Sequence, residues 1–98
     1  MEYRIQSDAQ GKTVFLSGRV TSRDFEGFKA LTALFEGADS QRLVLDLSAV
    51  EFMDSMGLGM VLMLQDKAKN KGVGLSLQGV KGQVKRLFEL VKLGNLPQ

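Results

Sequence analysis

The stretch of sequence that decides the fold is Leu45-Asp46-Leu47-Ser48-Ala49-Val50-Glu51-Phe52-Met53-Asp54-Ser55-Met56-Gly57-Leu58-Gly59. It begins as an apolar run typical of a buried strand, passes through a short connection, and then opens a helix at Asp54 and Ser55. Asp and Ser are strong N-caps, because their side-chain oxygens accept hydrogen bonds from the free N–H groups of a first helical turn. Gly57 and Gly59 remove side-chain bulk there, so we expect another surface to approach the backbone closely. The stretch therefore predicts a serine at the mouth of a helix.

Upstream of this stretch, the pattern predicts two strands and a helix. Residues 13–20 are rich in β-branched and aromatic side chains, and residues 3–6 form a short edge strand across a turn at 8–11. The Thr21-Ser22-Arg23-Asp24 segment has the form of a capping box. We therefore expect a helix from about Asp24 to Glu36.

The remaining segments alternate between strand and helix. Residues 42–47 are predicted as a central strand and residues 48–54 as a connection. A helix at about 56–70 follows, then a strand at 73–77 with strict apolar alternation. The last helix is expected at about 81–93, ahead of a short tail at 94–98.

The resulting order is β-β-α-β-α-β-α, which indicates an α/β fold. Strands that alternate with helices are joined by right-handed crossovers and form a mainly parallel sheet. We expect four strands, of which the N-terminal one is a short edge strand, and three helices. The length of 98 residues is that of one domain, 1–98.

Composition excludes several classes of function. The chain contains no Cys and no His, so disulfides, thiolate or Ser-His-Asp catalysis and His- or Cys-bound metals are ruled out. Asp46 and Asp54 have no third ligand in view and are interpreted as structural caps. We therefore expect no enzyme, no metal and no cofactor.

Charge and hydropathy restrict the classes of partner and the cellular location that the sequence favours. The net charge is only +2, and the 13 Lys and Arg residues form no dense block, which argues against nucleic acid as a partner. Neither a signal peptide nor an apolar run long enough to span a membrane is present. These features predict a cytoplasmic protein without membrane insertion.

A helix-mouth serine is also a suitable target for modification. A phosphate on Ser55 would add roughly −1.5 to −2 charge. The helix N-terminus tolerates an anion there, so the modification changes the surface without unfolding the domain. The competing interpretation is an ordinary cap. Among the nearby methionines, we expect Met53, Met60 and Met63 in the core and Met56 at the surface.

The segment that contains these residues resembles the STAS family, specifically the bacterial anti-sigma-factor antagonists. Their hallmark is Asp-Leu-Ser at the end of a strand, followed by Val-x-Phe-Met-Asp-Ser-x-Gly-Leu-Gly. Here it reads Asp46-Leu47-Ser48 and then Val50-Glu51-Phe52-Met53-Asp54-Ser55-Met56-Gly57-Leu58-Gly59. Two departures bear on partner choice: Met56 replaces a frequent Ser or Thr, and Thr21 replaces a frequent Asp.

The resemblance implies a phospho-switch that acts by partner switching in transcription regulation. The unphosphorylated domain would bind a partner serine kinase that is itself an anti-sigma factor, phosphorylation of Ser55 would release that partner, and a serine phosphatase would reset the switch. The implied partner-binding residues are Asp54, Met56, Gly57, Leu58 and Thr21. The alternative is a constitutive STAS subunit of a signalling or transporter-associated complex with no phosphorylation cycle.

Overall fold

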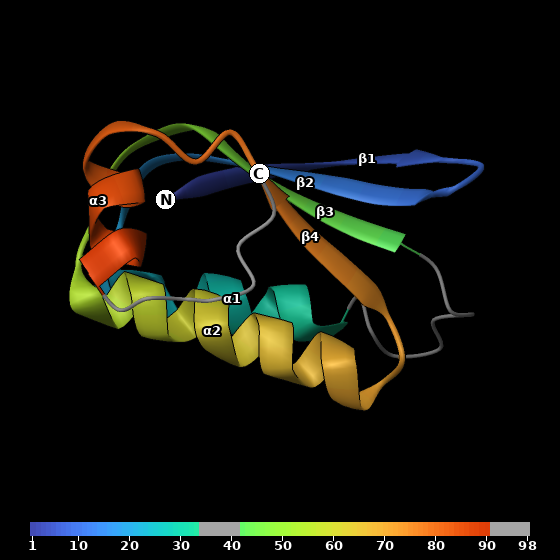
Figure 1. Ribbon diagram of the computed structural model, residues 1–98. Helices are drawn as coiled ribbons and strands as arrows, with labels where there is room; N and C mark the ends of the chain where they lie inside the picture. The colour runs from blue at the N-terminus through green and yellow to red at the C-terminus, as the bar shows by residue number, and fades with distance from the viewer. Residues whose placement is uncertain (34–41, 91–98) are drawn as a thin grey trace.

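The computed structural model describes residues 1–33 and 42–90, which form a single sheet covered by helices (Figure 1). The strand order is β1-β2-β3-β4, with β1 antiparallel to β2 and the other pairs parallel. The strands are β1 (Glu2–Asp8), β2 (Gly11–Val20), β3 (Arg42–Met53) and β4 (Gly74–Gln78). A short 3-10 turn, η1 (Ser22–Asp24), leads into α1, and the helices are α1 (Phe25–Thr32), α2 (Ser55–Asn70) and α3 (Gly82–Leu90). The predicted fold, a mainly parallel sheet of four strands with three helices, is confirmed.

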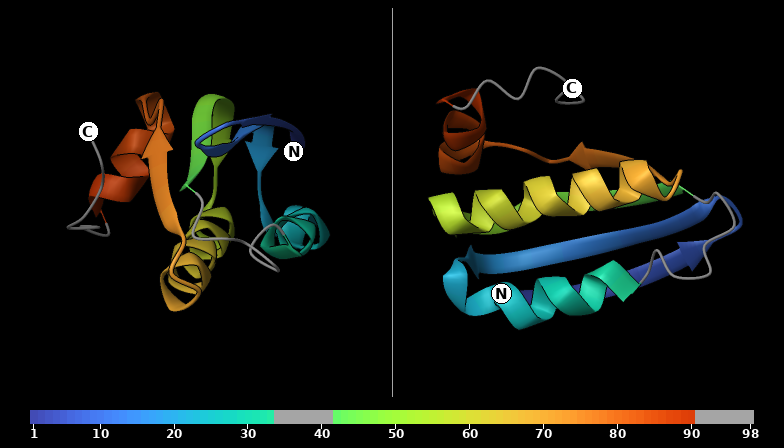
Figure 2. Two further views of the ribbon diagram at one scale, coloured as in Figure 1. Left: turned by 90° about the vertical axis from the view of Figure 1, so that its right-hand side faces the viewer. Right: turned by 90° about the horizontal axis from the view of Figure 1, so that it is seen from below.

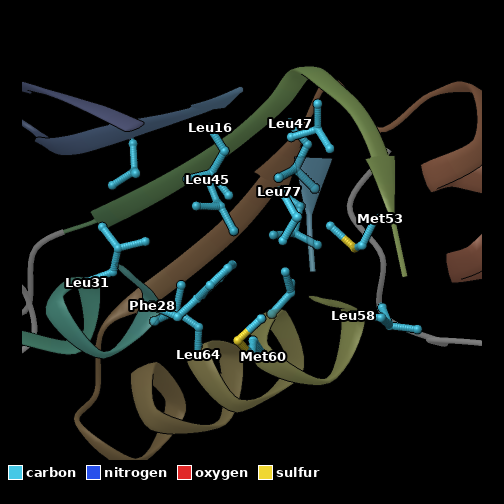
Figure 3. Close-up of a cluster of buried hydrophobic side chains, with 14 of the residues drawn as sticks. Leu16, Phe28, Leu31, Leu45, Leu47, Met53, Leu58, Met60, Leu64 and Leu77 are labelled. Carbon is cyan, nitrogen blue, oxygen red and sulfur yellow. The ribbon is translucent and has the colours of Figure 1, made fainter. Parts of the chain in front are cut away.

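Two of the three helices form a layer on one face of the sheet. Helices α1 and α2 lie side by side beneath the sheet, whereas α3 lies apart from this pair, near the start of α2 (Figure 2). The core fills the space between these layers. Alternate strand residues such as Leu16, Leu45 and Leu77 point down to meet Phe28 and Leu64 of the helices (Figure 3). This alternation is the period-2 pattern of a half-buried sheet.

Strand β3 is longer than the sequence indicated. The prediction of a connection at residues 48–54 is wrong, because β3 continues to Met53 and pairs there with Val20 of β2. The pairing of β2 with β3 continues past two shifts in register, one between Phe15 and Ser17 and one between Gly18 and Arg19. Such bulges bend a strand without ending it. The predicted ends of the first and last helices and the tail at 94–98 lie outside the described residues.

The extra length of β3 leaves one strand edge that β4 does not reach, since β4 pairs only with residues 42–46. Gln83 of α3 occupies the end of that edge. Its Nε2 donates a hydrogen bond to the Met53 carbonyl at 2.8 Å, and its Oε1 accepts one from the Met53 N–H at 3.0 Å. The side-chain amide thus pairs with β3 in the way a neighbouring strand would, and it ties α3 to the residue before Asp54.

We expect Gln83→Ala to lower the free energy of unfolding by about 1–3 kcal/mol, because two hydrogen bonds of about 0.5–1.5 kcal/mol each are lost. Urea denaturation followed by circular dichroism measures the change. Lys85→Ala is the matched control, since Lys85 is exposed on the same helix. Equal stability of the two variants would contradict this role for Gln83.

Candidate functional site at the start of helix α2

The site is built where β2 and β3 end and α2 begins. Asp54 has an extended backbone, and its Oδ1 accepts a hydrogen bond from the Gly57 N–H at 2.7 Å, so it is the N-cap of α2. Its own N–H donates to the Val20 carbonyl at 3.2 Å. The predicted capping role of Asp54 is confirmed, and Ser55 is the first residue of the helix.

Gly57 allows the first turn of α2 to pack directly against β2. A Cβ atom at this position would lie 2.4 Å from the Val20 carbonyl oxygen, far inside contact distance. The expected close approach therefore exists, but the approaching surface is this chain's own strand rather than a partner. Leu58 is also buried, with 3% of its surface exposed. Gly57 and Leu58 thus support the site from within, and their placement argues against the expected direct contact with a partner.

Gly59 provides the contrast, because nothing lies within 4 Å of where its Cβ would be. We expect Gly57→Ala to destabilise the domain by more than 2 kcal/mol, since α2 must move away from β2. Gly59→Ala should instead stabilise it by about 0.5–1 kcal/mol, the helix preference of Ala over Gly. Thermal unfolding of both variants measures the two changes, and a shift of the same sign in both would refute the packing argument.

Two residues of the first turn face outward. Ser55 is exposed, and Met56 exposes 59% of its surface, as expected for Met56. Within residues 1–33 and 42–90, the Ser55 hydroxyl has no hydrogen-bond partner, since Asp54 supplies the cap. The described part of the fold therefore does not depend on this hydroxyl.

The burial of the other methionines differs from the prediction at one position. Met53 and Met60 are buried, as expected. The prediction that Met63 belongs to the core is wrong, because 55% of its surface is exposed. Met63 lies on the flank of α2 that faces α1, where the two helices leave an open groove.

Thr21 lies on the neighbouring turn and caps it. Its Oγ1 accepts a hydrogen bond from the Arg23 N–H at 3.3 Å, and its N–H donates to Asp24 Oδ2 at 2.8 Å. This is the predicted capping box. Thr21 is half-buried and lines a shallow hollow together with Arg19, Arg23 and the Met1 amino group, which pairs with Asp24 at 3.0 Å. A partner contact by Thr21 stays a prediction.

Asp46 has a structural role that differs from the expected cap. Its Oδ1 accepts hydrogen bonds from the N–H and the hydroxyl of Ser48 at 2.8 and 2.5 Å, and its Oδ2 accepts one from Gln78 Nε2 at 2.7 Å. The carboxylate therefore joins β3 to β4. Burial alone would raise the pKa of Asp46, but the hydrogen bonds from Ser48 and Gln78 and the charge of Lys81 outweigh it, so the pKa lies below its ordinary value. Within the described ranges, no three His, Cys, Asp or Glu residues are grouped so as to hold a metal ion.

The lowered pKa makes a pH-dependent contribution to stability. Because the folded-state pKa lies below the unfolded value, the contribution is present above the unfolded pKa, near 3.8, and is lost as pH falls through the folded pKa. We expect the difference in unfolding free energy between wild type and Asp46→Asn to shrink between about pH 5 and pH 2. Urea denaturation across that range measures it, and a difference that stays constant with pH would rule this out.

The sheet order, the helices on one face and the exposed serine at the helix start define a STAS domain. The family model described as "Mlab, STAS domain" matches residues 3–98, and the chain belongs to this family. A curated relative, the intermembrane phospholipid transport system binding protein MlaB of Escherichia coli (strain K12), is 38% identical over 87 residues, which cover 89% of this chain and 84% of the relative.

Solved structures agree with this assignment. SpoIIAA, a Bacillus cell fate determinant in its phosphorylated form, superimposes with a TM-score of 0.73 at 21% identity, over 95% of this chain and 86% of that one. An anti-sigma factor antagonist from Mycobacterium paratuberculosis gives a TM-score of 0.75 at 26% identity, over 98% and 82%. The resemblance to STAS domains of the antagonist type is thus confirmed. No helix in the described part of the chain has the length and hydropathy needed to cross a membrane.

Proposed function

We propose that the chain is a non-enzymatic STAS subunit of an intermembrane phospholipid transport system, and that it attaches to a protein of that system through the start of α2. This is the alternative raised by the sequence, and it has better support than the anti-sigma-factor antagonist. The relative at 38% identity is named as a phospholipid transport system binding protein. The two antagonist-type structures share only 21% and 26% identity.

One observation carries the proposal: the first turn of α2 presents Ser55 and Met56 outward on a backbone that is fixed from two sides. Val20 holds Asp54 from the side of β2, and Gln83 holds Met53 from the side of α3. A surface ordered in advance loses little conformational entropy when a partner binds. A large exposed methionine beside a small serine offers an apolar anchor with a polar neighbour, which suits a protein interface.

The composition supports a binding role rather than catalysis. The chain has no His and no Cys, so Ser55 has no histidine to act as its general base. The MlaB relative is named as a binding protein and SpoIIAA as an anti-sigma factor antagonist, names that describe binding rather than a reaction.

The phospho-switch is the second candidate, and the unused hydroxyl of Ser55 favours it. Because Asp54 supplies the cap, a phosphate on Ser55 would cost the helix no hydrogen bond. The helix N-terminus would favour its charge, while the desolvation of that charge would oppose a bound partner. In this version a serine kinase of the anti-sigma type is the partner, and a phosphatase restores binding.

We expect Met56→Arg to weaken binding of the partner at least tenfold, about 1.4 kcal/mol, because a charge replaces the exposed apolar anchor. Ser55→Ala should bind as wild type does. Affinity purification of the chain from its own cells, with mass spectrometry of the recovered proteins, should return proteins of a phospholipid transport system. Lys69→Glu, exposed on the same helix, is the control.

The same affinity-purified samples distinguish the two candidate functions, the constitutive subunit and the phospho-switch. A constitutive subunit carries no phosphate on Ser55 under any growth condition, and wild type and Ser55→Ala recover the same proteins. A switch shows phospho-Ser55 in some conditions and recovers a kinase, and Ser55→Asp releases it. If Met56→Arg retains full binding, the start of α2 is not the docking surface.

A further inference from the structure

Helices α1 and α2 run side by side on the outer face of the domain (Figure 2). Side chains of both helices line a groove between them. The groove has a volume of about 200 Å³, and its lining is mainly apolar apart from two lysines and Thr32. Phe28 and Leu64 lie at its base and are buried, whereas Phe25 and Met63 expose 51% and 55% of their surfaces. Single exposed apolar side chains are common, but here two of them line one depression.

The α2 residues that line the groove belong to a row that begins at the start of the helix. Met56, Met60, Met63 and Lys67 follow one another at intervals of four, three and four residues. That spacing places them in one line along the helix. The last three line the groove, and Met56 stands beside Ser55. A partner that covers the start of α2 can therefore extend into the groove without a break in apolar contact.

The charge of the residues that line the groove indicates the charge of the partner. Lys29 of α1 and Lys67 of α2 are the charged residues that line it. Within residues 1–33 and 42–90, the ion pair between the Met1 amino group and Asp24 is the only one, so neither lysine is neutralised by a described residue. The complementary partner carries apolar side chains flanked by carboxylates.

The dimensions favour a helix over a lipid chain. The groove follows α1 from Phe25 to Thr32, a distance of about 10 Å at 1.5 Å per residue, or two helical turns. A site that encloses a small molecule measures roughly 300–1,000 Å³, more than this groove offers. An amphipathic helix needs only a line of two or three anchor side chains, and methionines adapt their shape to such anchors.

We propose that the α1–α2 groove receives an acidic amphipathic helix of a protein partner. The helix places its apolar side chains on Phe25, Met60 and Met63, and its carboxylates beside Lys29 and Lys67. This proposal deepens the proposed function and rests on it for one point, that a protein partner covers the start of α2.

Photo-crosslinking of the full chain in its own cells tests the groove. p-Benzoylphenylalanine is introduced in place of Met63, and in separate chains in place of Met56 and Lys69. Crosslinked peptides are identified by mass spectrometry. We expect position 63 to crosslink to one segment of one protein, with acidic residues flanking apolar residues at helical spacing, and position 69 to give at least tenfold less product.

Charge reversal then tests the lysines. Lys29→Glu combined with Lys67→Glu should reduce the crosslink at position 63 at least tenfold, whereas Lys69→Glu should leave it unchanged. Substituting Lys for the carboxylates of the identified segment should restore the crosslink with the double variant. Lys29, Lys67 and Lys69 are all exposed, so we expect these variants to fold. Circular dichroism of the double variant checks that its fold is retained.

Several outcomes overturn the proposal. These are crosslinks to lipid, to a second copy of this chain or to residues 34–41 of the same chain, and a yield at position 63 no higher than at position 69. Failure of the proposed function looks different. In that case position 63 captures an acidic helix of a protein outside phospholipid transport, and the groove assignment stands.

Discussion

The contact between the end of β2 and the first turn of α2 is the constraint on which the rest of the site depends. The Val20 carbonyl accepts a hydrogen bond from Asp54 and lies where a side chain on Gly57 would otherwise be. The helix can sit this close only because residue 57 has no Cβ. Since α2 cannot slide past that contact, the direction in which Ser55 and Met56 project is set by backbone packing rather than by their own interactions.

Much of this arrangement was predictable from local patterns. β-Branched and aromatic residues located the strand at 13–20, a continuous apolar run located the one at 42–47, and strict alternation located the one at 73–77. The capping residues Thr21 and Asp54 located two helix starts. The full length of β3 was not predictable, because residues 48–53 become strand through pairing with β2. The end of their other edge is held by Gln83, which bonds to Met53 from 30 positions away. The exposure of Met63 was not predicted from the sequence for a related reason. Helical spacing identifies the inner face of α2, but it does not reveal where the neighbouring helix leaves a gap.

The motif that identifies the family also serves the fold, and this limits what it says about function. Asp54 is required to cap α2, and Gly57 is required for its approach to Val20, whatever protein binds outside. Asp46 likewise joins β3 to β4. A transport subunit and an anti-sigma-factor antagonist therefore need the same residues at these positions. We expect the residues that distinguish the two to be those that the described part of the fold leaves unused, chiefly Ser55 and Met56.

The two candidate functions consequently differ less in structure than in what surrounds the chain. Because the Ser55 hydroxyl forms no hydrogen bond within residues 1–33 and 42–90, we expect a charge placed on it to affect partner binding more than the stability of the domain. The line from Met56 to Met63 extends about 10 Å along α2, at 1.5 Å per residue. On the two proposals together, we expect phosphorylation to release a partner bound only at the helix start, whereas a partner that also occupies the α1–α2 groove should retain most of its contact. The length of the interface along α2 would then decide whether Ser55 acts as a switch or as an ordinary contact.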